Sequence, residues 1–114
     1  QFSIFDRLAP EDQSVLLVET AENAGTDNEP AMVEAWLTGD LAAIEREAES
    51  GFLADPELRQ ALLTDRNRAW AERIAPLLAE NRRPLIAVGT AHLVGPDGLV
   101  ALLEARGYSI RRIQ

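Results

Sequence analysis

The sequence contains no cysteine and no lysine, and it has one histidine, His92. Without cysteine the chain cannot form a disulfide, use a thiolate nucleophile or build a cysteine-based zinc site. Its apolar residues never form an uninterrupted run of the length that crosses a bilayer, so we expect no membrane span. The cellular compartment stays open, because a secreted protein need not contain cysteine.

Positive charge is also scarce: 11 basic residues stand against 19 acidic ones, which gives a net charge of −8. Nucleic acids and anionic membranes are bound by clustered positive charge. The arginine pairs at 82–83 and 111–112 are too small for that purpose, so we expect no nucleic acid as a partner. The use of arginine alone, together with abundant alanine, is typical of a bacterial genome rich in G and C.

The 114 residues, of which 46% are hydrophobic, suit a single domain or a fragment of one. The chain begins with Gln1 rather than methionine, and no signal peptide is recognisable in it. We interpret the chain as a fragment that starts inside a longer protein. Part of an active site would then belong to the missing N-terminal half.

Residues 1–81 have the pattern of a mostly helical part. Proline, capping residues and glycine divide its first portion into short helices. These helices are predicted to begin near Pro10, Asn28, Asp40 and Asp55.

A longer helix is predicted to begin at Thr64 or Asp65, because apolar residues recur there at helical spacing. Pro76 falls inside this helix and predicts a kink or a local break. Trp36 and Trp70 are interpreted as core aromatics, since a tryptophan on an apolar helix stripe is usually buried.

Residues 82–114 have a different pattern. The run at 85–88 (LIAV) has strand length and predicts a strand buried on both faces. A loop from Gly89 to Gly95 follows, then a short helix, and then a closing strand near the end of the chain. Strand, helix and strand in this order predict a right-handed βαβ unit. The fold class is therefore expected to be α/β, with the 114 residues as an incomplete half of a larger domain.

His92 lies in the loop after the predicted strand, where open α/β sheets bind ligands. An imidazole can act as a metal ligand or as a general base near neutral pH. Gly89 and Gly95 flank it and would let the backbone approach a ligand closely. The alternative is a structural histidine that bonds a loop carbonyl. A metal would need further ligands from elsewhere, because one histidine does not hold it tightly.

Arg66 and Asn67 lie on or beside the apolar stripe of the longer helix. Because burying an unpaired charge is costly, Arg66 must be paired or must face a cavity. Arg66 could bind an anion or a carboxylate, and Asn67 could orient a partner. The alternative for Arg66 is an ion pair with an internal acid. Residues 95–98 (GPDG) open the last helix, and simple capping explains them better than anion binding, since Asp97 would repel an anion.

Several segments, taken in order, resemble the TraB/GumN family, which is related to the Tiki membrane proteases. Their order and spacing fit that family over nearly the whole chain. The matching segments are 35–40 (AWLTGD), 66–71 (RNRAWA), 88–95 (VGTAHLVG), 98–99 with 102–103, and 107–108.

The resemblance implies an α/β fold whose site combines two Gly-x-x-His motifs and a glutamate, with the first motif and the glutamate in the first half of the protein. The second motif corresponds to Gly89 and His92, and an Arg-Asn pair corresponds to Arg66 and Asn67. The first motif and its glutamate have no counterpart in this chain. The resemblance also implies a periplasmic or other extracytoplasmic location.

Two functions follow as expectations. The first is a metal-dependent hydrolase of the peptidase type, inactive as an isolated fragment, in which His92 binds Mn²⁺, Co²⁺ or Zn²⁺ or acts on its bound water. Arg66 would hold a substrate carboxylate or a developing oxyanion, and Asn67 would orient His92 or the substrate. The second is a non-catalytic module that binds a small ligand, haem or a partner. The fragment could also form a homodimer, since it would expose apolar surface.

Overall fold

A computed structural model describes residues 9–11, 13–14, 17–18 and 29–113 of the chain. The chain divides into two compact units, residues 1–62 and 63–114, and each is described by itself. Of the helix predicted from Pro10, residues 10–11, 13–14 and 17–18 are helical, and the remainder lies outside the described residues.

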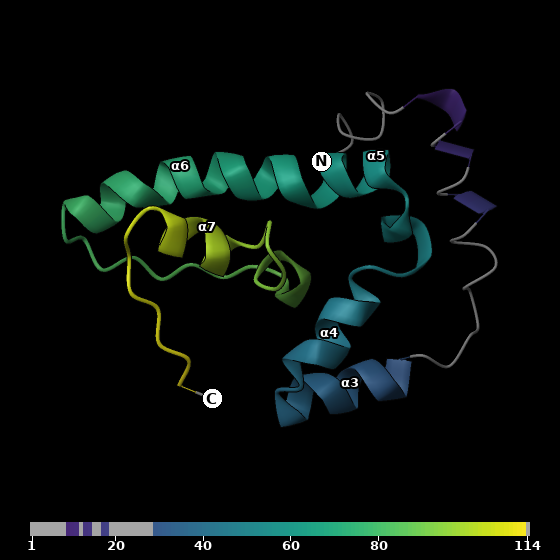
Figure 1. Ribbon diagram of the computed structural model, residues 1–114, viewed down its shortest axis with the longest axis horizontal. Helices are drawn as coiled ribbons and strands as arrows, with labels where there is room; N and C mark the ends of the chain where they lie inside the picture. Colours follow the sequence, from purple (N-terminus) through teal and green to yellow (C-terminus); the bar gives the residue numbers. More distant parts are fainter. Residues whose placement is uncertain (1–8, 12, 15–16, 19–28, 114) are drawn as a thin grey trace. The chain divides into compact units, whose positions relative to one another are not determined.

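In the first unit, helices α3 and α4 form where the sequence predicts them (Figure 1). Helix α3 spans Glu29–Thr38 and ends before Gly39, whose φ of 69° is the left-handed conformation that closes helices. Helix α4 spans Leu41–Glu47, and the Asp40 carboxylate accepts a hydrogen bond of 3.0 Å from the Ala43 amide at its start.

The rest of the first unit consists of short helical turns. A 3-10 turn, η1 (Gly51–Ala54), precedes α5 (Pro56–Arg59), and the Asp55 carboxylate caps α5 by accepting from two backbone amides. A π-helical turn, η2 (Gln60–Thr64), contains the boundary between the two units. The buried apolar residues include Ile44 and Leu58, but Trp36 is 63% exposed, so the prediction of a core aromatic there is wrong.

In the second unit, α6 (Asp65–Ala79) and α7 (Leu99–Ala105) lie side by side (Figure 1). Helix α6 continues through Pro76, so the expected break does not occur. The Tyr108 hydroxyl donates to the Ala75 carbonyl at 3.2 Å and fastens the chain after α7 to α6. The core between these helices consists of Ala71, Ile74 and Leu99, with Trp70, Leu78, Val88, Leu102 and Leu103 packed against it.

The α/β class and the βαβ unit predicted for residues 82–114 are wrong, because the structure is helical and the described residues form no strand or sheet. The two segments predicted as strands, 85–88 and 108–113, make no ladder with each other. Leu85 is 97% exposed, whereas a strand buried on both faces would hide it. An apolar run becomes a strand only when a neighbouring segment pairs with its backbone.

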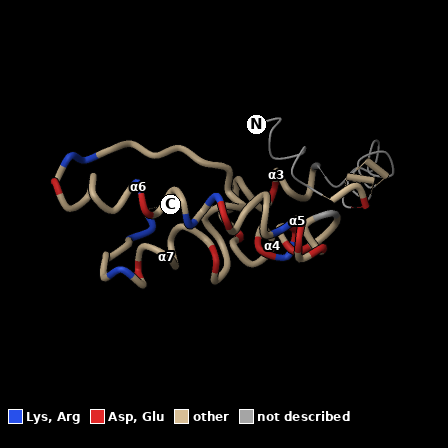
Figure 2. The backbone as a smooth tube through the Cα atoms, turned by 90° about the horizontal axis from the view of Figure 1, so that it is seen from above, with Lys and Arg blue, Asp and Glu red and all other residues tan. Residues whose placement is uncertain are grey.

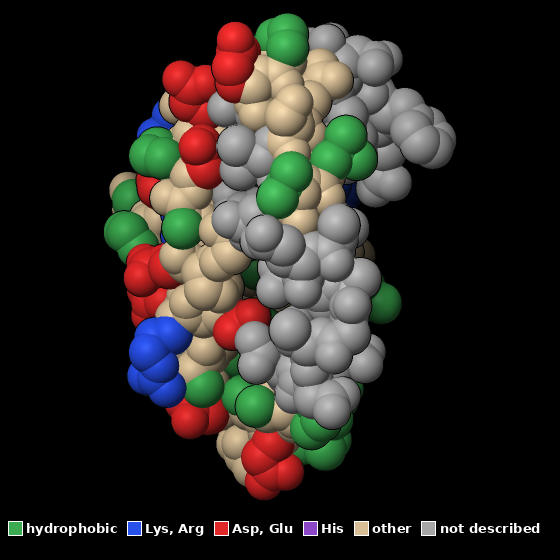
Figure 3. Space-filling model, turned by 90° about the vertical axis from the view of Figure 1, so that its right-hand side faces the viewer, with side chains coloured by type: hydrophobic (Ala, Val, Ile, Leu, Met, Phe, Trp, Pro, Cys, Tyr) green, Lys and Arg blue, Asp and Glu red, His purple; other side chains and the backbone are tan. Residues whose placement is uncertain are grey.

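Charge is distributed unequally between the two units. Residues 29–62 contain eight acidic and two basic residues, whereas residues 63–113 contain five acidic and eight basic residues (Figure 2). On the face shown in Figure 3, acidic side chains are more frequent than basic ones. Within the part of the chain that the structure describes, no helix combines the length and the apolar content that a membrane crossing needs.

Candidate functional site

The first half of α6 presents three neighbouring side chains with different surroundings. Asn67 is 2% exposed, whereas Arg66 and Trp70 are half-buried. Residues four positions apart lie on the same helix face, so Arg66 stands above Trp70. The guanidinium carbon of Arg66 lies 4.9 Å from the centre of the Trp70 ring, within the range of a cation–π interaction.

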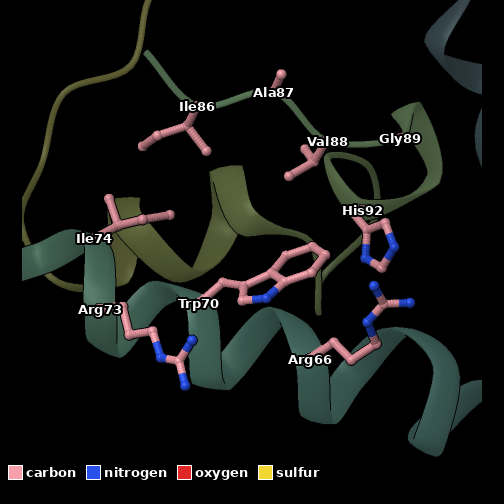
Figure 4. Close-up of a pocket in the computed structure, with 9 residues that line it drawn as sticks. All are labelled: Arg66, Trp70, Arg73, Ile74, Ile86, Ala87, Val88, Gly89 and His92. Carbon is pink, nitrogen blue, oxygen red and sulfur yellow. The ribbon is translucent and has the colours of Figure 1, made fainter. Parts of the chain in front are cut away.

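The spacing of the Gly-x-x-His motif is that of one 3-10 turn. This turn, η3 (Thr90–His92), has the His92 amide donating to the Gly89 carbonyl at 2.9 Å. A hydrogen bond between residues three apart brings the start and the end of the motif together. The turn directs the imidazole of His92 towards α6 (Figure 4).

Asn67 connects this turn to the next one through its side-chain amide. Its Nδ2 donates to the Asp97 carbonyl at 2.9 Å, and its Oδ1 lies 2.7 Å from Nδ1 of His92. Because the donation to Asp97 fixes which end of the amide is oxygen, His92 must donate through Nδ1–H. The neutral imidazole then has its proton on Nδ1 and a free lone pair on Nε2.

The surroundings of His92 favour this neutral form. Burial of the ring lowers the pKa of His92 below its usual 6.5, and the positive charge of Arg66 lowers that pKa further. The ring also packs against Trp70, with centroids 4.7 Å apart and planes tilted by 50°. Nε2 is therefore available near neutral pH as a proton acceptor or as a ligand.

These residues border a cavity of about 530 Å³. Ile86 and Val88 point into it from the extended segment, whereas Ala87 points away (Figure 4). Arg66 is directed towards the imidazole, whereas Arg73 lies farther along α6 and extends below the helix in this view. The side chains that line the cavity include two arginines and no carboxylate. They belong to Arg66, Trp70, Arg73, Ile74, Ile86, Val88 and His92, and the residues Ala87 and Gly89 complete the lining.

The structure thus brings together His92, Arg66, Asn67 and Gly89, as the sequence suggested. Arg66 forms no ion pair within the described residues and faces the cavity instead. Gly95 does not line the cavity; its φ of 78° serves the turn that leads to α7.

The turn that contains Asp97 contacts α6 and does not form an anion-binding site. Its carbonyl accepts from Asn67, and its carboxylate lies 3.9 Å from Arg68. Sequence reasoning missed Trp70 as a site residue because an aromatic on an apolar stripe indicates only burial. Its spacing of four from Arg66 is the signal that could have revealed it.

A divalent metal was expected at His92. Within the described ranges, no three His, Cys, Asp or Glu side chains come close enough together to hold a metal ion. One imidazole does not make a metal site, since three or four protein ligands are usual for zinc. The described residues alone therefore do not fit a metal ion.

Comparison with known proteins gives one family and no individual relative. No curated protein and no solved structure matches the chain. The model of the TraB/PrgY/gumN family matches residues 1–112, which is nearly the whole chain and includes every residue of the cavity. The chain belongs to the TraB/PrgY/gumN family.

Proposed function

We propose that the chain forms part of a hydrolase of the peptidase type, with His92, Arg66 and Asn67 in its active site. The observation that carries this proposal is the free Nε2 of His92, which the bond to Asn67 leaves open beside Arg66. An imidazole in this state can accept a proton from an attacking water molecule. The relation that we expect between this family and the Tiki membrane proteases points to the same reaction class.

Each of the three side chains has a role in this proposal. His92 accepts the proton of the attacking water at Nε2. Arg66 binds a carboxylate of the substrate or stabilises the negative charge that develops on its carbonyl oxygen, because a cation in a poorly solvated site is effective for either. Asn67 is a positioning residue that holds the imidazole in the tautomer with the proton on Nδ1.

The full-length protein would complete this site. We expect ligands for Mn²⁺, Co²⁺ or Zn²⁺ from the missing N-terminal half, with the chain as the C-terminal half, or from a second copy in a homodimer. Nε2 of His92 would then serve either as a metal ligand or as the proton acceptor, because its one lone pair cannot do both. An extracytoplasmic location is part of the same proposal.

Metal binding and peptide hydrolysis in the full-length protein test this proposal. Replacing His92→Ala should abolish hydrolysis and weaken Mn²⁺, Co²⁺ or Zn²⁺ binding measured by calorimetry. The matched control is Arg68→Gln, which removes a charge from the same helix outside the cavity. Unchanged metal affinity in the His92→Ala protein would exclude His92 as a ligand, and unchanged hydrolysis would exclude it from the reaction.

A second candidate function is haem binding without catalysis. Apolar side chains line most of the cavity, an open imidazole stands at one end and two arginines could meet propionate groups. Titration of the protein with haem would then shift the haem absorbance spectrum, and His92→Ala would remove the shift. A spectrum that is the same with and without the protein excludes this candidate.

A further inference from the structure

We infer that the cavity binds the C-terminal residue of a peptide whose last side chain is apolar. This inference rests on the proposed peptidase function and names its substrate class. It assigns the terminal carboxylate to Arg66, the last amide N–H to Nε2 of His92 and the apolar side chain to the walls of the cavity.

The hydrogen bonds of His92 require a donor on the ligand. Nδ1 already donates to Asn67, so a neutral ring keeps the lone pair of Nε2 as its one acceptor, and His92 lines the cavity. A carboxylate cannot pair with a lone pair, because it has no proton to donate. A ligand that satisfies Nε2 must bring an N–H or O–H group, and the amide of a peptide bond is such a group.

The guanidinium of Arg66 requires a hydrogen-bond acceptor that carries negative charge. Its guanidinium is half-buried, lies over Trp70 and has no ion pair within the described residues. The chain carries a net charge of −8, yet the charged side chains that line the cavity are both arginines. This local excess of positive charge is complementary to a carboxylate.

A peptide C-terminus carries the two polar groups close together. The last amide nitrogen and the terminal carboxylate are bonded to the same Cα atom, so they can reach two neighbouring partners at once. In the cavity, the guanidinium of Arg66 is directed towards the imidazole of His92 (Figure 4). A free amino acid would place an ammonium group at the same point and would bring a second charge to be desolvated.

The walls of the cavity determine the kind of side chain. Trp70 and Ile74 from α6 face Ile86 and Val88 from the extended segment. Burial of a leucine or phenylalanine side chain against them would contribute favourable transfer free energy, whereas a charged side chain would lose its hydration. The volume of about 530 Å³ lies within the range of small-ligand sites.

The test measures ligand binding without metal and without turnover, so its outcome is independent of whether the protein hydrolyses peptides. The full chain is used with Trp36→Phe, which leaves Trp70 as its one tryptophan and reports binding at the cavity by fluorescence. The probes are N-acetyl-leucine, N-acetyl-leucine amide and hexanoate at pH 8, where the imidazole is neutral. We expect N-acetyl-leucine to bind more tightly than either of the others.

Two arginine substitutions complete the test. Arg66→Gln should weaken the binding of N-acetyl-leucine by at least about tenfold, because a charge-assisted hydrogen bond is lost. Arg68→Gln removes the same charge from the same helix outside the cavity, and it should change the affinity by less than about threefold.

Four results would overturn the inference. The amide could bind as tightly as the acid, or Arg66→Gln could leave the affinity unchanged, and either would remove the carboxylate from Arg66. Hexanoate could bind as tightly as N-acetyl-leucine, which would show that the N–H group contributes nothing. Absence of any saturable fluorescence change with N-acetyl-leucine would also contradict it. None of these results would decide whether the full-length protein hydrolyses peptides, because the test measures binding alone.

Discussion

The two units of the chain are held together by hydrogen bonds of different range. In the first unit, Asp40 and Asp55 cap helices two or three residues ahead, and Arg59 donates to the Ala48 carbonyl 11 positions back. In the second unit, side-chain bonds span 25, 30 and 33 positions: His92 to Asn67, Asn67 to Asp97, and Tyr108 to Ala75.

This difference explains where the candidate chemistry lies. A local cap stabilises its own helix and places no distant groups together. A long-range bond between buried side chains fixes the orientation of a group such as His92 relative to another helix. Substitutions in the second unit should therefore cost more stability than caps in the first, and should also change the site.

The largest effect is expected at Asn67. Asn67→Leu removes a buried side chain and leaves the Nδ1–H of half-buried His92 and the Asp97 carbonyl without their partner, and should lower the free energy of unfolding by about 2 kcal/mol. Urea unfolding measures the loss. The control Asn67→Asp keeps an acceptor for His92 and should raise the pKa of that histidine. A loss below about 1 kcal/mol for Asn67→Leu would show that these bonds do not hold the unit together.

An effect of similar size is expected at Gly98, which the sequence did not distinguish from other glycines. A Cβ at this position would lie 2.5 Å from the Val94 carbonyl oxygen and 2.7 Å from that of Leu93. Gly98→Ala should therefore cost about 2 kcal/mol in urea unfolding, because backbone atoms must shift.

Gly89→Ala is its matched control. The added Cβ there meets the Cδ2 atom of His92 at 3.7 Å, an ordinary contact. The free energy of unfolding should change by less than about 0.5 kcal/mol. Equal losses for the two glycines would contradict the packing of the turn before α7.

The helix caps of the first unit should contribute less to the free energy of unfolding than Asn67 and Gly98 do. Asp55→Ala removes the acceptor for the amides of Glu57 and Leu58 and should cost about 1 kcal/mol in urea unfolding. Asp55→Asn keeps a side-chain acceptor and should restore most of the loss. If Asp55→Ala cost as much as Asn67→Leu, the distinction between the two units would fail.

The smallest effect on stability is expected from the titration of His92. Its pKa in the folded chain is lowered, first by burial and then by Arg66, so the unfolded state takes up the proton first as the pH falls through about 6.5. The free energy of unfolding should therefore decline as the pH falls below about 6.5, until His92 is protonated in the folded state too. Above about pH 6.5, His92 should not affect the free energy of unfolding.

An NMR titration measures this pKa without ambiguity, because the chain has one histidine. The midpoint should lie below 6.5, and Arg66→Gln should move it upwards by removing the charge. A midpoint above 6.5, or one that Arg66→Gln does not change, would contradict the placement of the imidazole beside Arg66.

The helices were predictable from the sequence where their ends are marked locally. Asp40, Gly39 and Asp55 act within a few residues of their own positions, so their effect does not depend on distant parts of the chain. The run at 85–88 has no such mark. Its length and apolar composition indicate a strand only if a neighbouring segment pairs with its backbone, and that pairing is decided by the tertiary structure.

The site was predictable in part for the same reason. The spacing of Gly89 and His92 is that of one turn, and the position of Arg66 and Asn67 beside an apolar stripe indicated that they face inwards. The pairing of Asn67 with His92 was a hypothesis that the structure supports by a distance of 2.7 Å. The position of Trp70 against the imidazole could not be predicted, because 22 residues separate the two in the chain.

The sequence by itself determined the helix ends, the acidic balance and the identity of the one titratable ring near neutral pH. Only the tertiary structure decided that this ring would donate through Nδ1, keep Nε2 open and stand beside a cation over Trp70. The physical reason is that a tautomer, a pKa and a cavity depend on groups within a few ångströms in space, whatever their separation along the chain.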